Sequence, residues 1–311
     1  MRYLFFDIEG ANCYNFVSKM CTFGYVITNE KFHVNSKVDV IINPESPFDR
    51  HILLKNMNAY PVDVYNKRPS FKYFYQAIKN ILEESEQLIV GWSVENDVKY
   101  IYDACQRYSC KQIKYSFLDL QKVYMKVENL TTQPSLEDAC SKYNIELLVN
   151  HKSDDDAMLT MQLAKAICKS LKITLQELFE QNMDCCSTVE EYSRKALTRE
   201  EIEFRIQRRK VINAIKNTKR KYKKSNPNIN DTEVYAFVND VIDTHSDKLL
   251  KIIRYIIDCG ASVTNNLKLC TTLICDHDSL DIFKSKIQYS KMTIISFEDF
   301  MDLINKVKVT N

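Results

Sequence analysis

The segment MRYLFFDIEG, residues 1–10, places two acids in an otherwise mostly apolar stretch. Residues 2–8 are predicted to form a strand, because aromatic and β-branched side chains favour extended backbone. Side chains alternate between the two faces of a strand, so the carboxylates of Asp7 and Glu9 are expected on one side. Two carboxylates held so close repel each other unless a cation such as Mg²⁺ or Mn²⁺ lies between them. From this pair alone, an exposed strand end with two solvated acids is an equally good interpretation.

The elements that follow predict an α/β fold with a mixed sheet flanked by helices. They are recognised by the spacing of their apolar residues and by breaks at proline and glycine. Strands are expected at residues 2–8, 21–28, 31–43, 87–92 and 115–118, and helices at residues 70–86, 94–107, 119–127, 135–144 and 153–171.

A third acid, Asp97, follows the strand predicted at residues 87–92 and begins the next helix. A carboxylate at that position can face the same edge of the sheet as Asp7 and Glu9. Taken alone, Asp97 is better explained as an acid that interacts favourably with the positive end of a helix.

The run HKSDDD, residues 151–156, places a histidine in the loop before a long predicted helix. Ser153 and the three acids suit the first turn of that helix, so two of them need only interact with the helix end. From the preceding loop, the His151 imidazole can reach a carboxylate of the first turn. A histidine five residues ahead of Asp156 is a better candidate for a general base than a lone histidine.

Together, Asp7, Glu9, Asp97 and Asp156 offer the ligands that a two-metal phosphodiesterase needs. Such enzymes hold two divalent ions between carboxylates, on either side of the scissile phosphate. A histidine beside them can remove a proton from the attacking water.

Three motifs resemble those of the DnaQ-like exonucleases of the DEDDh subclass. Phe6 to Gly10 is similar to the first motif, Gly91 to Asp97 to the second, and His151 to Ala157 to the third. The resemblance covers roughly residues 1–170, and its strength lies in the order and separation of all three motifs. Residues 10, 11, 92, 93 and 96 depart from the usual pattern without removing an acid, which leaves open how the terminal nucleotide is gripped and whether it belongs to DNA or RNA.

This resemblance implies a ribonuclease H-like fold and 3′–5′ cleavage of single-stranded nucleic acid with two Mg²⁺ or Mn²⁺ ions. It also implies that Asp7, Glu9, Asp97 and Asp156 are metal ligands and that His151 is the general base. DNA is the favoured substrate. The alternatives are a 3′–5′ exoribonuclease, an endonuclease on the same fold, or a non-catalytic scaffold for nucleic acid or protein. Roles in DNA repair, DNA replication or RNA turnover stay open.

Residues 188–224 form a polar segment that is expected to be largely helical. Between residues 194 and 224 the chain has 13 basic and 3 acidic residues. Its end is predicted to bind nucleic-acid phosphates without reading sequence, through Lys219, Arg220, Lys221, Lys223 and Lys224. A solvated helix packed on one domain is the plainer interpretation of such a charge run.

Residues 232–306 resemble a BRCT domain, a small α/β module. The resemblance rests on an apolar helix at 249–260, a central strand at 271–275, and a last strand and helix beginning at Thr293 and Phe297. It implies a protein or DNA partner rather than further chemistry. Three regions are therefore expected: an exonuclease domain at 1–180, a basic helical linker at 181–230 and a BRCT-like domain at 231–311.

The chain has no apolar run of 18 or more residues, so no membrane-spanning helix is expected. The N-terminus, with one basic residue and an acid by position 7, does not resemble a signal peptide. We therefore expect a cytoplasmic protein without membrane contact.

Overall fold

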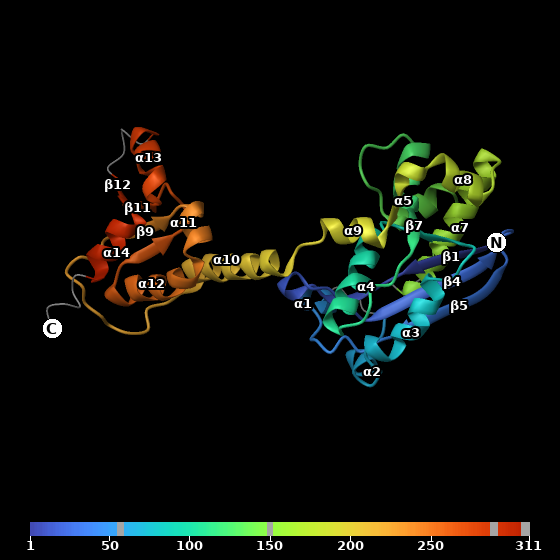
Figure 1. The fold of residues 1–311 in the computed structure, drawn as a ribbon, viewed down its shortest axis with the longest axis horizontal. Coiled ribbons are helices and arrows are strands. Elements are labelled where there is room, and N and C mark those ends of the chain that lie inside the picture. The colour runs from blue at the N-terminus through green and yellow to red at the C-terminus, as the bar shows by residue number, and fades with distance from the viewer. Residues whose placement is uncertain (55–58, 148–151, 287–291, 306–311) are drawn as a thin grey trace. The chain divides into compact units, whose positions relative to one another are not determined.

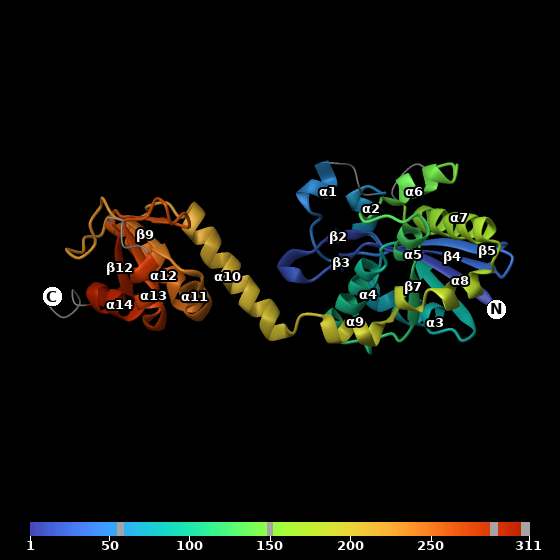
Figure 2. The same ribbon diagram turned by 90° about the horizontal axis from the view of Figure 1, so that it is seen from above.

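The structure is a computed structural model that describes residues 1–54, 59–147, 152–286 and 292–305. The chain divides into two compact units, Met1–Ala196 and Leu197–Asn311 (Figures 1 and 2). Each unit has its own hydrophobic core.

The N-terminal unit is built on a six-stranded mixed sheet in the order β5-β4-β1-β6-β7-β8. β1 pairs antiparallel with β4 and parallel with β6, so the first strand lies at the centre. The predicted mixed sheet is confirmed. The strands are β1 (Arg2–Asp7), β4 (Thr22–Asn29), β5 (Val34–Ile41), β6 (Gln87–Gly91), β7 (Ser116–Asp119) and β8 (Cys186–Thr188).

Helices cover both faces of this sheet, and β1 shows how its side chains divide between them. Tyr3 and Phe5 are buried together with residues of α7, whereas Leu4 and Phe6 are buried with residues of α3 and α4. Asp7 continues the alternation toward the side of α7. These helices are α3 (Phe71–Leu82), α4 (Glu95–Arg107), α5 (Leu120–Val127), α6 (Leu136–Lys142), α7 (Ser153–Leu171) and α8 (Leu175–Gln181).

Several short elements of this unit were not predicted from the sequence. They are too short to show a hydrophobic period, which is the main signal in a sequence. They are the strands β2 (Gly10–Asn12) and β3 (Lys19–Met20), the edge strand β8, and the helices α1 (Arg50–Leu54), α2 (Val62–Asn66) and α8.

The segment predicted as largely helical from 188 to 224 contains two helices instead of one. These are α9 (Val189–Lys195), which contacts α4, and α10 (Arg199–Asn217), which contacts α12 of the C-terminal unit. A capping box begins each helix, formed by Thr188 with Glu191 and by Thr198 with Glu201. Such boxes stop a helix from extending backward through them, so the chain breaks between the two.

The C-terminal unit is a four-stranded parallel sheet in the order β10-β9-β11-β12. The helix expected at 249–260, the strand expected at 271–275 and the last strand and helix are present, whereas β10, α11 and α13 were not predicted. The elements are β9 (Val234–Phe237), α11 (Asn239–Thr244), α12 (Ser246–Cys259), β10 (Ser262–Thr264), β11 (Thr272–Cys275), α13 (Leu280–Lys286), β12 (Thr293–Ser296) and α14 (Phe297–Asn305).

Among the helices of the described ranges, none has both the length and the apolar character that a membrane span requires.

Candidate active site

Three carboxylates from distant parts of the sequence meet at the end of β1. One oxygen each from Asp7, Glu9 and Asp156 lies within 4.8 Å of the others. Asp7 is the last residue of β1, Glu9 follows two positions later, and Asp156 is in the first turn of α7. The predicted juxtaposition of the first and third motifs is therefore present in the structure.

Asp97 lies beside these three acids, in the first turn of α4. It is 4% exposed, and its Oδ1 accepts a hydrogen bond from the Ile8 backbone N–H at 3.0 Å. Ile8 lies between Asp7 and Glu9, so this bond fixes α4 to the backbone that carries both acids. Asp97 is thus a first-turn acid of α4 whose side chain is buried against β1 rather than solvated.

Only one of the three consecutive acids in α7 joins the cluster. Asp154 and Asp155 both pair with Lys37 on β5, with a distance of 3.3 Å from Lys37 Nζ to Asp154 Oδ2. Asp156 is directed to the other side, toward Asp7 and Glu9. His151, the predicted general base, lies outside the described residues.

Mutual repulsion and burial disturb the ionisation of these acids in the metal-free protein. Burial, followed by the charges of Asp97, Glu9 and Asp156, raises the pKa of Asp7 well above its usual range. Burial and the charge of Asp156 raise the pKa of Glu9 to about 8. A bound cation relieves both effects, because it replaces the protons between the carboxylates. The all-oxygen donor set suits a hard divalent ion such as Mg²⁺ or Mn²⁺.

We expect Mg²⁺ to stabilise the protein more strongly at about pH 9 than at about pH 6. The folded-state pKa of Glu9, about 8, exceeds its ordinary value of 4.5. Proton binding by Glu9 therefore stabilises the folded, metal-free protein fully below about pH 4.5. This contribution to the free energy of unfolding is lost as the pH rises through about 8. Above that pH the ion no longer competes with protons. Thermal unfolding with and without Mg²⁺ at both pH values measures the effect, and an equal gain at both would contradict it.

A glycine on β4 allows α7 to approach the sheet at this point. Gly24 pairs with Asp7 across the β1–β4 ladder. A Cβ atom on Gly24 would lie 2.0 Å from the Ser153 carbonyl carbon and 2.1 Å from the Asp154 nitrogen. The first turn of α7 therefore rests on the bare backbone of Gly24, which brings Asp156 down to the level of Asp7.

Comparison with known proteins agrees with this geometry. Residues 4–164 match the family model described as Exonuclease (RNase_T), which covers more than half of the chain. The chain belongs to this exonuclease family. Its members are phosphodiester hydrolases, so the prediction of an exonuclease-type enzyme domain is confirmed. No curated protein sequence matches the chain.

Several solved structures are similar to the exonuclease domain at low identity. A 3′-exonuclease that recognises the 3′ end of a histone mRNA stem-loop is 13% identical, with a TM-score of 0.46, over 54% of this chain and 63% of its own. Escherichia coli exonuclease I with a dA16 oligonucleotide is 16% identical, with a TM-score of 0.49, over 58% of this chain and 42% of its own. Cell-death related nuclease 4 is 11% identical, with a TM-score of 0.46, over 55% of this chain and 64% of its own. The chain thus spans less than two thirds of the length of each.

A buried hydrogen-bond network behind the acids of the exonuclease domain was not predicted from the sequence. Ser153, which is fully buried, donates to Asp39 Oδ1 of β5 at 2.9 Å and lies 2.8 Å from the Thr22 hydroxyl. The Thr22 hydroxyl accepts from the Glu9 backbone N–H at 3.3 Å. Tyr60 donates its hydroxyl proton to Asp39 Oδ2 at 2.7 Å. The network thus joins Glu9 to the start of α7, and so fixes the relative positions of Glu9 and Asp156.

Asp39 is a fifth carboxylate near the metal ligands that the sequence implies. Its charge contributes to the raised pKa values of both Asp7 and Glu9. Its own two oxygens are already occupied by the hydroxyls of Ser153 and Tyr60, so it supports the site from behind. Nothing in a single sequence separates such an acid from other acids on strands, because its role depends on the pairing of β4 with β5.

Replacing Ser153 by alanine is expected to weaken the affinity for Mn²⁺ by about tenfold, the usual cost of losing a group that orients metal ligands. Ser153→Ala breaks the link between Asp39 and Thr22 and leaves an oxygen of Asp39 unsatisfied. The loss should appear as a higher Mn²⁺ concentration for half-maximal cleavage, with most of the rate recovered at saturating Mn²⁺. Ser187→Ala, which alters an exposed hydrogen bond to Glu191, is the control and should leave the Mn²⁺ dependence unchanged. A loss of rate that saturating Mn²⁺ does not restore would argue against this role.

The predicted nucleic-acid contacts Lys219 to Lys224 lie in the C-terminal unit and are not helical. α10 ends at Asn217, where Thr218 takes an extended conformation, so residues 218–224 form an irregular segment. The prediction that the basic helix continues to residue 224 is wrong. This segment instead folds against α12.

Proposed function

We propose that the N-terminal unit is a metal-dependent 3′–5′ exonuclease that acts on single-stranded nucleic acid, with DNA as the favoured substrate. The observation that carries the proposal is the meeting of Asp7, Glu9 and Asp156 within 4.8 Å, in a chain whose residues 4–164 match the exonuclease family. Asp97, hydrogen bonded to Ile8, completes the four acids.

In this proposal the four carboxylates hold two Mg²⁺ or Mn²⁺ ions. Such ions, when bound, activate a water and stabilise the negative charge that develops on the phosphate and the leaving oxygen. The chain itself provides the geometry. Gly24 sets the distance between α7 and β4, and the hydrogen bonds of Ser153 and Thr22 set the distance from Glu9 to Asp156. His151 is proposed to accept the proton of the attacking water, which is worth about 10²- to 10⁴-fold in rate.

The test is degradation of a 3′-labelled and a 5′-labelled strand in the presence of Mg²⁺ or Mn²⁺. A 3′–5′ exonuclease releases the 3′ label first as a mononucleotide and shortens the 5′-labelled strand stepwise. It leaves a circular single strand whole, whereas internal cuts in the circle would identify an endonuclease. Matched DNA and RNA oligomers under one metal condition decide between the exodeoxyribonuclease and the exoribonuclease. Binding without any cleavage would favour the non-catalytic scaffold.

We also propose that the C-terminal unit is BRCT-like and binds a protein or DNA partner. In support, its elements occur in the expected order, with α12 as the first helix, β11 as the central strand, and β12 and α14 at the end. The tryptophan common in that last helix of BRCT domains is missing here, and the nearby Phe297 and Phe300 are both buried. Phe297 stacks on His245 with ring centroids 4.0 Å apart. Retention of a defined partner by the full chain, lost on deletion of residues 231–311, is the expected result. Unchanged retention by the shortened chain would refute it.

A further inference from the structure

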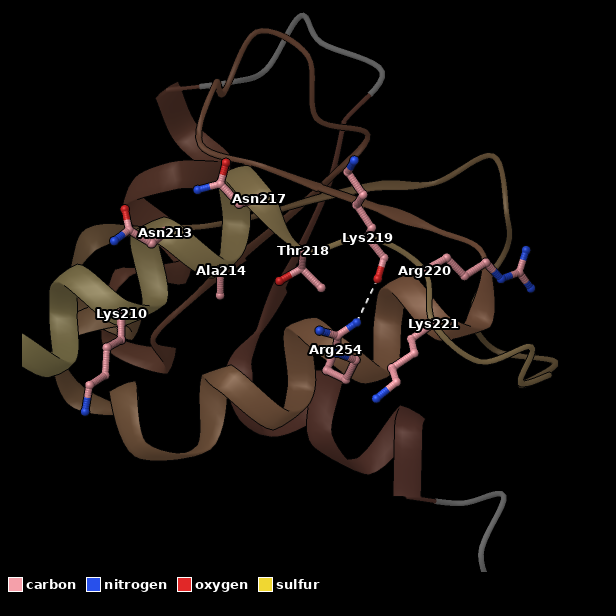
Figure 3. A pocket seen from close by; sticks show the side chains of 9 residues that line it. All are labelled: Lys210, Asn213, Ala214, Asn217, Thr218, Lys219, Arg220, Lys221 and Arg254. Carbon is pink, nitrogen blue, oxygen red and sulfur yellow. Dashed lines mark hydrogen bonds between the residues drawn. The ribbon is translucent and has the colours of Figure 1, made fainter.

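A hollow of about 680 Å³ on the C-terminal unit is surrounded by positive charge (Figure 3). Of its nine lining residues, five are cationic and Ala214 is the single apolar one. None of the nine is acidic, among the residues that the structure describes. The five cations are Lys210, Lys219, Arg220, Lys221 and Arg254.

These cations come from three segments that hydrogen bonds hold together. Lys210 is on α10, Lys219 to Lys221 follow that helix, and Arg254 is on α12. Arg254 donates to the Lys219 carbonyl oxygen at 2.7 Å, the bond drawn in Figure 3. The position of the hollow is therefore fixed by the fold of this unit.

A buried carboxylate anchors the basic segment from below. Asp258 Oδ1 accepts from the backbone N–H groups of Lys221 and Tyr222, at 3.1 and 3.0 Å. These N–H groups lower the pKa of Asp258, which keeps it ionised at neutral pH. Asp258 Oδ1 is thus bonded to backbone groups of the segment, and the side chains of Lys219 and Lys221 remain exposed.

In the described part of the chain the cations of the hollow form no salt bridge, in contrast to two arginines on α10. Arg208 pairs with Asp243 at 2.6 Å and Arg199 with Glu203 at 3.1 Å. For the five cations around the hollow, no salt bridge within 4.0 Å is found in the described ranges. Five cations gathered without a salt-bridge partner create a positive surface, which attracts anions.

The remaining polar groups fit the same ligand. Asn213 and Asn217, four residues apart on one face of α10, and the Thr218 hydroxyl add neutral hydrogen-bond donors. No aromatic side chain lines the hollow among the described residues, so a base has no surface on which to stack. The donors are those that contact phosphate and sugar, which position a nucleic acid without reading its sequence.

We propose that this hollow binds the phosphate backbone of single-stranded nucleic acid, as a second contact for the substrate of the exonuclease domain. The inference rests on the proposed function for the choice of nucleic acid among polyanions. It also changes the set of binding residues expected from the sequence. Lys210 and Arg254 enter, whereas Lys223 and Lys224 do not line the hollow, and the Lys224 ammonium lies 5.3 Å from the centre of the Tyr255 ring.

The test is the affinity of the full chain for a fluorescein-labelled oligothymidylate, measured by anisotropy in EDTA at several salt concentrations. Lys210→Gln with Lys221→Gln removes two exposed cations from the hollow. Each lost phosphate contact lowers the salt slope by about 0.7, which is about fivefold in affinity at about 0.1 M salt. We expect the double variant to bind about 25-fold more weakly, with a slope smaller by about 1.4.

Lys216→Gln with Lys251→Gln is the matched control, because both lysines are exposed on α10 and α12 and neither lines the hollow. It should lose less than about threefold, since only the general attraction of the surface changes. Equal weakening of both double variants, or no weakening of the first, would overturn the proposal. Polyglutamate and unlabelled oligothymidylate are then compared as competitors at equal charge. Equally strong competition by polyglutamate would also overturn the proposal and would indicate that the hollow binds an acidic protein.

Hydrolysis of the p-nitrophenyl ester of thymidine 5′-monophosphate separates this proposal from the proposed function. That small ester reports on the exonuclease site alone, and the Lys210→Gln, Lys221→Gln variant should cleave it at the wild-type rate. One outcome is that neither the ester nor a strand is cleaved, while the two double variants still differ in affinity. The proposed exonuclease activity is then wrong, and the proposed binding of nucleic acid at the hollow is retained. If cleavage proceeds but the two double variants bind with equal affinity, the proposed binding at the hollow is wrong and the proposed exonuclease activity is retained.

Discussion

Replacing Asp7 by asparagine is expected to abolish cleavage and, at the same time, to stabilise the metal-free protein. Asp7 is surrounded by Asp97, Glu9 and Asp156, and their charges together with burial raise its pKa. A neutral amide of the same size removes one buried like charge from the cluster. It also removes a proposed metal ligand, which should slow cleavage at least about a thousandfold, or about 4 kcal/mol of transition-state stabilisation.

Two measurements check this prediction. Cleavage of a 3′-labelled strand should fall to background at every Mn²⁺ concentration. In EDTA at about pH 8, the midpoint of thermal unfolding of the N-terminal unit should rise by about 2–4 °C for each kcal/mol gained. At about pH 4 the rise should vanish, because the wild-type carboxyl is then protonated in the folded protein and no longer repels its neighbours.

Asp155→Asn is the matched control for the loss of one negative charge. Asp155 precedes Asp156 in the same helix, but it pairs with Lys37 at the surface. Its replacement should change the cleavage rate by less than about threefold and should not stabilise the metal-free protein, since exposed ion pairs contribute little. If Asp7→Asn behaves like Asp155→Asn, the acids at the end of β1 are not the active site.

The part of the site that could be predicted from the sequence is the part that local pattern determines. The spacing of Asp7 and Glu9 on a strand and the position of Asp156 in a first helical turn are local facts. Their meeting follows once α7 crosses the central strands, which it does through contacts with β1 and β4. The family motifs supplied the expectation that Asp97 joins them.

The part that could not be predicted depends on pairing and close approach between distant segments. Asp39 reaches the site because β5 pairs with β4, and Gly24 matters because it faces the first turn of α7. Glycines and acids also occur on strands far from any active site, so neither residue stands out in a sequence. The break between α9 and α10 is different, because the capping box of Thr198 and Glu201 is visible in the sequence as a Thr-x-x-Glu pattern.

Replacing Gly24 by alanine is expected to destabilise the N-terminal unit by about 3 kcal/mol, toward the upper end for overpacked cores. The added methyl group would lie 2.0 Å from the backbone of Ser153, and backbone yields less than a flexible side chain. The first turn of α7 must then move away from β4. That movement carries Asp156 away from Asp7 and Glu9 and pulls Ser153 away from Asp39.

The displacement should cost more activity than the loss of stability explains. A shift of about 1 Å in a catalytic group can cost about 100-fold in rate, so cleavage should fall by about that factor even where the protein remains folded. Activity measured well below the unfolding midpoint, together with the Mn²⁺ concentration for half-maximal rate, separates the two effects. Both the rate and the Mn²⁺ affinity are expected to decrease.

Val26→Ala provides the comparison that decides the cause. Val26 lies two residues further along β4, is fully buried and belongs to the core cluster that includes the residues of α7. Its truncation leaves a cavity beneath the helix and lowers stability without pushing the first turn outward. The Val26 variant should therefore keep its Mn²⁺ affinity and most of its rate while folded. Equal losses in the two variants would mean that the height of α7 above Gly24 does not set the position of Asp156.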